Sequence, residues 1–302
     1  MLASTMLTRS IPSTGEAMPV IGLGTWRAFD VGNEIFSRRG LMEVLQVFLD
    51  AGGRIIDTSP MYGRAEAVTG SLLAELAARP RAFLATKVWT TGRERGIEQM
   101  RRSAELLRSD VIDLMQIHNL VDWRTHLATL RRMKGEGRVR YIGITHYTTG
   151  ALPELARILD SEPDIDFVQL GYSLATRAAE TELLPAAAAR GAAVIVNQPL
   201  ERGELFRRVR GRPLPDWAHE FECASWAQLF LKYILAEPAV TCVIPATGNS
   251  EHMRDDLGAG FGALPDNRQR RQIRELWDSA LAGPVRSTRW AMLQRCTSEG
   301  PS

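Results

Sequence analysis

Four side chains that can donate, accept or stabilise a proton stand where short apolar stretches of the sequence end. Asp57 follows two isoleucines, and Tyr62 comes a few residues later in the same segment. Lys87 and His118 close two further apolar stretches. A phenol is a weak acid with a pKa of about 10, but a neighbouring ammonium group stabilises the phenolate and lowers that pKa. The residue types therefore predict a proton-transfer site with Tyr62 as its general acid.

The other three side chains complete this site. Lys87 supplies the positive charge that lowers the pKa of Tyr62, and Asp57 is the counter-charge that a buried lysine needs. His118 can hydrogen-bond to a substrate oxygen and orient it. Singly, each residue also has a structural explanation, such as a rim ion pair, a surface aromatic or a core histidine. Their joint occurrence at neighbouring strand ends favours a catalytic role.

Such a site requires a scaffold that brings distant segments to one edge. From about residue 40, short β-rich stretches alternate with longer amphipathic ones, which is typical of parallel strands joined by helices. The expected strands are 20–24, 54–57, 82–88, 111–118, 139–145, 167–170, 192–197 and 240–245. The expected helices are 41–51, 65–78, 96–107, 123–135, 152–159, 182–190 and 224–236. Eight strands with interleaved helices predict an α/β fold, a closed (β/α)8 TIM barrel.

The rest of the chain fits around this barrel. The segment before residue 20 predicts an N-terminal β-hairpin, and the sequence after the eighth strand predicts extra C-terminal helices. No linker or composition break divides the chain, so residues 1–302 are expected to form a single domain. Because the loops after the strands share one concave face, the four side chains are expected to meet there.

Composition excludes several functional classes. The net charge is +2, from 37 basic and 35 acidic residues, which gives no field suited to nucleic acid or a membrane surface. Three cysteines without CxxC spacing predict neither a disulfide framework nor a metal site. Without a secretory signal or a long apolar segment, the chain is expected to be cytoplasmic. The sequence leaves its oligomeric state open, and a monomer is compatible with it.

Six short motifs give the chain a resemblance to the aldo-keto reductases that covers nearly its whole length. They are GLGTW at 22–26, DTSPMYG at 57–63, TKVW at 86–89, DLMQIH at 113–118, YIGIT at 141–145 and VIPAT at 243–247. The resemblance implies an NAD(P)H-dependent oxidoreductase that reduces aldehydes or ketones to alcohols by hydride transfer. It also implies that Asp57, Tyr62, Lys87 and His118 are the catalytic tetrad.

The same resemblance implies where a coenzyme would bind. The chain has no glycine-rich dinucleotide motif that leads into a helix, so the coenzyme is expected to lie extended across the strand ends. The matching positions are Gly24, Thr25, Trp26, Asp57, Thr145, His146, Gln169, Asn197, Gln198, Pro199, Leu200, Gly203, Leu205, Thr247, Asn249, His252 and Asp256. Of these, the segment from Pro199 to Leu205 resembles the loop that covers the pyrophosphate.

Three departures from the family pattern affect this coenzyme site. His146 stands where the family usually has asparagine, and Asn197 replaces an aromatic residue that stacks on the nicotinamide in many members. After the last strand, Ala246 and His252 stand where members that prefer NADPH often carry cations, and Asp256 stands where asparagine is usual. Phosphate recognition favours cations and disfavours a nearby carboxylate. NADPH remains the coenzyme implied by the family, and NADH is possible.

Substrate contacts are expected from Trp26, Tyr62, Trp89, His118 and Trp123, whose aromatic surfaces suit an apolar carbonyl compound. The segment 217–226 and the tail with Trp290 are expected to serve in packing or as a cover.

Two other functions are compatible with the same barrel, since a fold alone does not fix an activity. One is a regulatory protein that binds the coenzyme without significant turnover. The other is a Schiff-base lyase in which Lys87 is the nucleophile.

Overall fold

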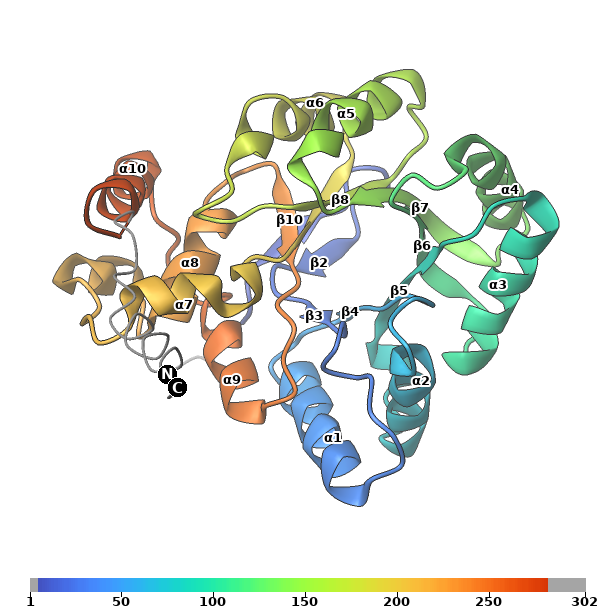
Figure 1. Ribbon diagram of the computed structural model, residues 1–302, viewed down its shortest axis with the longest axis horizontal. Helices are drawn as coiled ribbons and strands as arrows, with labels where there is room; N and C mark the ends of the chain where they lie inside the picture. The colour runs from blue at the N-terminus through green and yellow to red at the C-terminus, as the bar shows by residue number, and fades with distance from the viewer. Residues whose placement is uncertain (1–4, 282–302) are drawn as a thin grey trace, which may run out of the picture.

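A computed structural model describes residues 5–281 and contains an eight-stranded parallel sheet that forms a barrel (Figure 1). The strands are β3 (Leu23–Gly24), β4 (Ile55–Asp57), β5 (Phe83–Val88), β6 (Ile112–His118), β7 (Val139–His146), β8 (Phe167–Gly171), β9 (Ala193–Asn197) and β10 (Val240–Val243). Each strand pairs with the next one in the sequence. Parallel bridges from Ile21 to Val243 and from Gly24 to Ala246 join the last strand to the first. The predicted (β/α)8 barrel is therefore confirmed.

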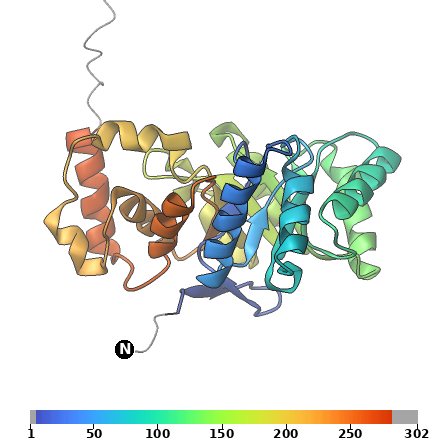
Figure 2. The same ribbon diagram turned by 90° about the horizontal axis from the view of Figure 1, so that it is seen from below.

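The predicted N-terminal hairpin is also present. Strands β1 (Thr8–Ser10) and β2 (Ala17–Pro19) pair in antiparallel fashion, and the hairpin lies across one end of the barrel (Figure 2). Ile11 and Met18 from the hairpin are fully buried and pack with the side chains that fill the barrel interior. The hairpin thus closes the end of the barrel at which the strands begin, and the end at which they finish is left as the open face.

The barrel strands are covered by helices that return the chain from one strand to the next. They are α1 (Ile35–Asp50), α2 (Ala65–Glu75), α3 (Arg93–Leu106), α4 (Trp123–Gly135), α5 (Leu152–Ser161), α6 (Leu183–Arg190), α8 (Trp226–Leu235) and α9 (Ser250–Gly258). The first helix begins six residues earlier than the sequence predicts. The apolar pattern starts at Leu41, the first buried residue of α1, whereas Ile35 and Phe36 are exposed. The apolar pattern therefore marks only the part of α1 that packs against the core.

An insertion between β9 and α8 carries the short helix α7 (Glu204–Val209), and α10 (Asn267–Leu276) follows the barrel as an extra C-terminal helix. A buried lysine, Lys232, links these additions, because its ammonium donates to the carbonyls of Phe221 (2.7 Å), Phe261 (2.7 Å) and Ala263 (2.8 Å). The predicted tail with Trp290 lies outside the described residues. Segment 217–226 packs as expected, with Trp226 against Phe230.

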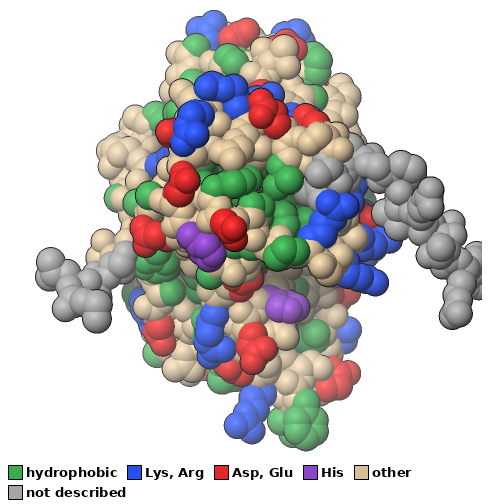
Figure 3. Space-filling model, turned by 90° about the vertical axis from the view of Figure 1, so that its left-hand side faces the viewer, with side chains coloured by type: hydrophobic (Ala, Val, Ile, Leu, Met, Phe, Trp, Pro, Cys, Tyr) green, Lys and Arg blue, Asp and Glu red, His purple; other side chains and the backbone are tan. Residues whose placement is uncertain are grey.

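On the side of the molecule built by these additions, the described surface carries no large patch of one charge sign (Figure 3). Figure 3 shows basic and acidic side chains interspersed there around a small apolar area. No helix within residues 5–281 has both the length and the apolar character needed to cross a membrane.

Candidate active site

The end of β4 and the end of β5 place a buried ion pair at the open face of the barrel. Lys87 Nζ donates to Asp57 Oδ1 at 2.6 Å and to the Thr58 carbonyl at 2.8 Å, and its side chain has no exposed surface. The second carboxylate oxygen of Asp57 accepts from Gln116 Nε2 (3.1 Å) and Gln169 Nε2 (2.8 Å). Both oxygens thus have charged or polar donors, which a buried carboxylate requires.

This pairing fixes the charge state of Lys87. Burial lowers the pKa of Lys87, but the carboxylate of Asp57 and the nearby Tyr62 outweigh burial, so the pKa is raised. The amine therefore remains a protonated ammonium at neutral pH. A Schiff base requires the free amine as nucleophile, so this environment disfavours the lyase mechanism.

Tyr62 lies directly against this ammonium at the rim of the site. The Lys87 Nζ atom is 5.2 Å from the centre of the Tyr62 ring. The charge of Lys87 lowers the pKa of Tyr62, as predicted, but it does not set the direction of the overall shift. Burial of the phenol raises its pKa more than the charge of Lys87 lowers it. Tyr62 therefore stays protonated at neutral pH, which is the state that a proton donor needs.

His118, the last residue of β6, faces Tyr62 with its ring edge. The ring centres are 6.0 Å apart and the planes are nearly perpendicular. The Nδ1 atom lies 3.0 Å from the hydroxyl of Ser59. Burial, the charge of Lys87 and His146 lower the pKa of His118 to about 3. The imidazole is therefore neutral at pH 7, with one N–H to donate.

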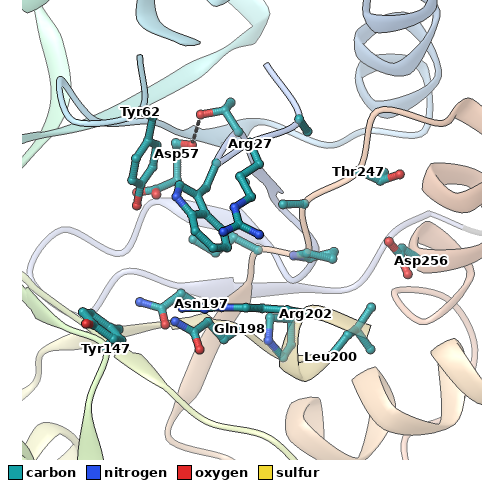
Figure 4. A pocket seen from close by; sticks show the side chains of 18 of the residues that line it. Arg27, Asp57, Tyr62, Tyr147, Asn197, Gln198, Leu200, Arg202, Thr247 and Asp256 are labelled. Atoms are coloured by element: carbon teal, nitrogen blue, oxygen red, sulfur yellow. Dashed lines mark hydrogen bonds between the residues drawn. The ribbon is translucent and has the colours of Figure 1, made fainter. Parts of the chain in front are cut away.

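These side chains sit at one end of a long pocket of about 1020 Å³ that runs across the strand termini (Figure 4). Ordinary small-molecule sites occupy roughly 300 to 1,000 Å³, so this pocket suits an extended ligand. Tyr62 and Tyr147 mark one end, and Thr247 and Asp256 mark the other. Most of the predicted site residues line it: Gly24, Thr25, Trp26, Asp57, Tyr62, His118, Thr145, Gln169, Asn197, Gln198, Pro199, Leu200, Gly203, Thr247, His252 and Asp256.

Among the predicted coenzyme contacts, three do not line this pocket. His146 stacks on Tyr147 and accepts from the backbone of Thr148, so the neighbouring tyrosine faces the pocket instead. Leu205 is buried in α7, and Asn249 uses its side chain to cap the N-terminus of α9. These three side chains therefore do not line the pocket, and their contacts with a coenzyme stay predictions.

Two predicted substrate contacts also lie outside the pocket lining. Trp123 is buried at the start of α4, where it packs in the core that surrounds the barrel. Trp89 is 42% exposed, and its ring centre lies 6.4 Å from that of His118. Trp26 does line the pocket, as predicted.

Two arginines that the sequence motifs do not indicate enter the middle of the pocket. The guanidinium carbons of Arg27 and Arg202 lie 4.3 and 4.6 Å from the centre of the Trp26 ring, so both cations pack on one indole. Both residues have positive backbone φ angles, which is uncommon for residues with side chains. Such strain concentrates where the surrounding structure holds a functional geometry. Their positions between the two ends are visible in Figure 4.

Beside the buried ion pair, the amide side chains at the ends of β8 and β9 form a connected network. Gln169 Oε1 accepts from Thr145 Oγ1 and from Asn197 Nδ2, both at 3.2 Å. The Oδ1 atom of Asn197 is buried and has no hydrogen-bond partner within the described chain. Asn197 therefore presents a free acceptor close to the tetrad, where the family pattern often has an aromatic ring.

The far end of the pocket has a different electrostatic character. His252, Asp255 and Asp256 line it together with Ala246 and Thr247. The two arginines of the described lining, Arg27 and Arg202, lie in the middle of the pocket and not at this end (Figure 4). Burial, followed by the charge of Asp255, raises the pKa of Asp256 to about 8. Asp256 is therefore mostly protonated at neutral pH, which removes one negative charge from this end and leaves a hydrogen-bond donor.

A closed (β/α)8 barrel whose strand ends carry a buried Lys–Asp pair, a tyrosine and a histidine at a long pocket defines a class of barrel enzymes. Comparison with known proteins identifies the family. Residues 20–278 match the model of the aldo/keto reductase family. The chain belongs to the aldo/keto reductase family, and it is therefore an oxidoreductase of carbonyl compounds.

Individual relatives are distant but cover most of the chain. A methylglyoxal reductase of Escherichia coli strain K12 is 25% identical over 83% of this chain and 89% of its own length. A glyoxal reductase of Bacillus subtilis strain 168 is 27% identical over 75% of this chain and 78% of its own length. The crystal structure of a Klebsiella pneumoniae aldo-keto reductase in complex with NADPH superposes with a TM-score of 0.76. It is 24% identical, and the match covers 97% of this chain and 100% of that chain.

Proposed function

We propose that the protein reduces small aldehydes or ketones to alcohols with a nicotinamide coenzyme, and that Tyr62 donates the proton to the carbonyl oxygen. The observation that carries this proposal is the placement of a protonated phenol against the Lys87–Asp57 pair, with a neutral histidine facing it across the pocket. In reduction, the bound coenzyme supplies a hydride to the carbonyl carbon.

The residues of this chain perform the proton half of the reaction. Tyr62 gives its proton to the carbonyl oxygen as negative charge develops there. The ammonium of Lys87 then stabilises the phenolate that remains, and Asp57 keeps that ammonium in place. A neutral His118 donates a hydrogen bond to the same oxygen and orients the carbonyl.

Several features of the pocket fit a dinucleotide. The unpaired Oδ1 of Asn197 can accept from a carboxamide near Tyr62. Arg27 and Arg202 bring positive charge to the middle of the pocket, where a diphosphate bridge would cross. We propose NADPH as the coenzyme, as in the Klebsiella complex, with NADH as the second candidate because the far end lacks a cation.

The substrate class is proposed from the relatives. Those named above are a methylglyoxal reductase and a glyoxal reductase, which suggests a small dicarbonyl compound. Trp26, Met61 and Phe206 give the pocket apolar walls that also accept a larger aldehyde.

The proposal is tested by following the absorbance of reduced nicotinamide with the purified protein, methylglyoxal or an aromatic aldehyde, and either NADPH or NADH. Carbonyl-dependent coenzyme consumption is expected. Tight coenzyme binding without consumption for any carbonyl compound would instead favour the regulatory, non-catalytic barrel.

The far end of the pocket gives a test of coenzyme choice. Ala246 is exposed and lines this end, so a lysine there can pair with the 2′-phosphate of NADPH. We expect Ala246→Lys to raise the ratio of kcat/KM for NADPH over NADH about 10-fold, because a hydrogen bond to a charged group contributes roughly 1.5 to 3 kcal/mol. Ala246→Met has a similar length without the charge and should leave the ratio unchanged. An unchanged ratio in the lysine variant would show that residue 246 does not face the 2′ position.

A further inference from the structure

A hydroxyl that the sequence analysis did not single out contacts the histidine of the site. Ser59 lies two residues after Asp57, in the loop that leads to Tyr62, and is fully buried. Its Oγ atom is 3.0 Å from Nδ1 of His118, the only polar contact of that ring nitrogen in the described chain. The backbone N–H of Met61 also donates to Oγ, at 3.4 Å.

The direction of the Ser59 hydrogen bond decides what the other ring nitrogen can do. A neutral imidazole has one N–H, so when one ring nitrogen accepts a hydrogen bond, the proton must be on the other ring nitrogen. His118 is neutral at pH 7, since its pKa is lowered to about 3 by burial, Lys87 and His146. Because Nδ1 contacts Ser59, Nε2 is the nitrogen left for a ligand in the pocket.

Hydrogen-bond satisfaction favours one of the two directions. If Nδ1 carried the proton, the hydroxyl of Ser59 would accept from both Nδ1 and Met61, and its own O–H would have no acceptor. An unsatisfied buried donor costs roughly 1 to 3 kcal/mol. If Ser59 donates to Nδ1 instead, both the hydroxyl and Nδ1 have a partner, and Nε2 carries the N–H towards the pocket.

We infer that Ser59 is a positioning residue that fixes His118 in the tautomer with its proton on Nε2, so that the ring donates to the carbonyl oxygen of the substrate. The inference rests on the proposed reduction for its catalytic meaning, whereas the tautomer itself is a property of the free protein. With the proton on Nδ1, His118 would present a lone pair to the carbonyl oxygen and repel it. The hydroxyl of Ser59 thus orients the substrate through the ring and does not touch it.

The direct test is the ring nitrogen spectrum of His118 in protein labelled with ¹⁵N-histidine. The chain has five histidines, and the signals of His118 are assigned by their loss in His118→Gln. The wild-type protein should show the tautomer with hydrogen on Nε2. Ser59→Ala should lose this preference and show a mixture or the opposite tautomer. A wild-type spectrum with hydrogen on Nδ1, or an unchanged tautomer in Ser59→Ala, would overturn the inference.

Kinetics give the second readout. Ser59→Ala should lower kcat/KM for the carbonyl substrate about 5- to 10-fold, the effect of losing one oriented neutral hydrogen bond, and leave coenzyme affinity unchanged. The matched control is Thr69→Val, which removes another buried hydroxyl, on α2, that has no partner in the described chain. The control should change neither tautomer nor rate. An unchanged rate in Ser59→Ala also contradicts the inference.

The two readouts separate this inference from the proposed function. If the wild-type protein reduces no carbonyl compound with either coenzyme, the proposed function fails. The nitrogen spectrum then still decides whether Ser59 fixes the tautomer of His118. If the wild-type protein is an active reductase and Ser59→Ala retains its tautomer, only the role of Ser59 fails.

Discussion

Tyr62→Phe is expected to lower kcat for carbonyl reduction by about 100- to 10,000-fold, the range that a general acid contributes. The phenylalanine ring fills the same space beside Lys87 and His118 but has no proton to give. The measurement is the rate of coenzyme oxidation at saturating aldehyde. Because Tyr62 is half-buried at the rim and its ring remains, the free energy of unfolding should change little.

Coenzyme affinity is the control for this variant. The coenzyme proposed here spans the pocket from Asn197 to Asp256, and most of its contacts lie away from the phenol, so fluorescence titration should give a nearly unchanged dissociation constant. A variant with close to the normal rate would exclude Tyr62 as the proton donor. A variant that loses coenzyme binding would show that its low rate has another cause.

The dependence of the reduction rate on pH in the wild-type protein should reflect the ionisation of Tyr62. Burial raises the pKa of Tyr62 above that of an ordinary phenol, which is about 10. The acid must be protonated for reduction, so the rate should hold across neutral pH and fall only when pH exceeds this range. Residual turnover in Tyr62→Phe should lack this alkaline fall.

The sequence predicted the barrel because its strands repeat a simple pattern. Eight apolar β-rich stretches separated by amphipathic helices leave few other arrangements, and the predicted (β/α)8 barrel was confirmed. The error at the start of α1 arose because Ile35 and Phe36 continue the helix on its exposed side. A periodicity signal detects buried faces, so it does not detect exposed turns of a helix.

The site could be predicted only at residues with ionisable side chains that stand at the ends of predicted strands. Asp57, Lys87 and His118 end strands, and strand ends converge in space in any barrel of this kind. Ser59 carries no such signal, because a serine in a loop is common and its contact with His118 depends on the fold of the loop. Arg27 and Arg202 are also absent from the motifs, since they meet at Trp26 from loops that are far apart in the sequence.

The pKa of Tyr62 shows where reasoning from residue types was incomplete. Sequence predicted the charge of Lys87 beside the phenol, but it did not show that partial burial of the phenol would outweigh that charge. In the structure, burial dominates, and Lys87 only partly opposes it. The role of Lys87 in reduction is therefore to stabilise the phenolate that forms after proton transfer, rather than to make the resting phenol acidic.

Lys87→Met tests this role and should have the largest effect on stability. It leaves the carboxylate of Asp57 buried without its cation, and breaking a buried ion pair costs about 3 to 5 kcal/mol. The rate per folded molecule should fall about 100- to 1,000-fold, as when one preorganised donor to a developing anion is removed. Equilibrium unfolding in denaturant and turnover normalised to folded protein measure the two effects.

Lys232→Met is the matched control because Lys232 is the other fully buried lysine of the described chain, held by three backbone carbonyls far from the tetrad. It should also lower the free energy of unfolding, since buried carbonyls lose their donor. Its turnover per folded molecule should remain near that of the wild type. Equal losses of turnover in both variants would mean that Lys87 acts only through stability.

A double substitution isolates the contribution of the pair itself. In Lys87→Met with Asp57→Asn, neither charge remains, and Gln116 and Gln169 still hydrogen-bond at residue 57. The double variant should therefore lose less stability than the sum of the two single variants, because each single change leaves one buried charge unpaired. Its turnover should stay as low as that of Lys87→Met, since the phenolate of Tyr62 has lost its stabilising cation. Additive losses of stability would show that the two charges are not coupled and that Lys87 is held mainly by the Thr58 carbonyl.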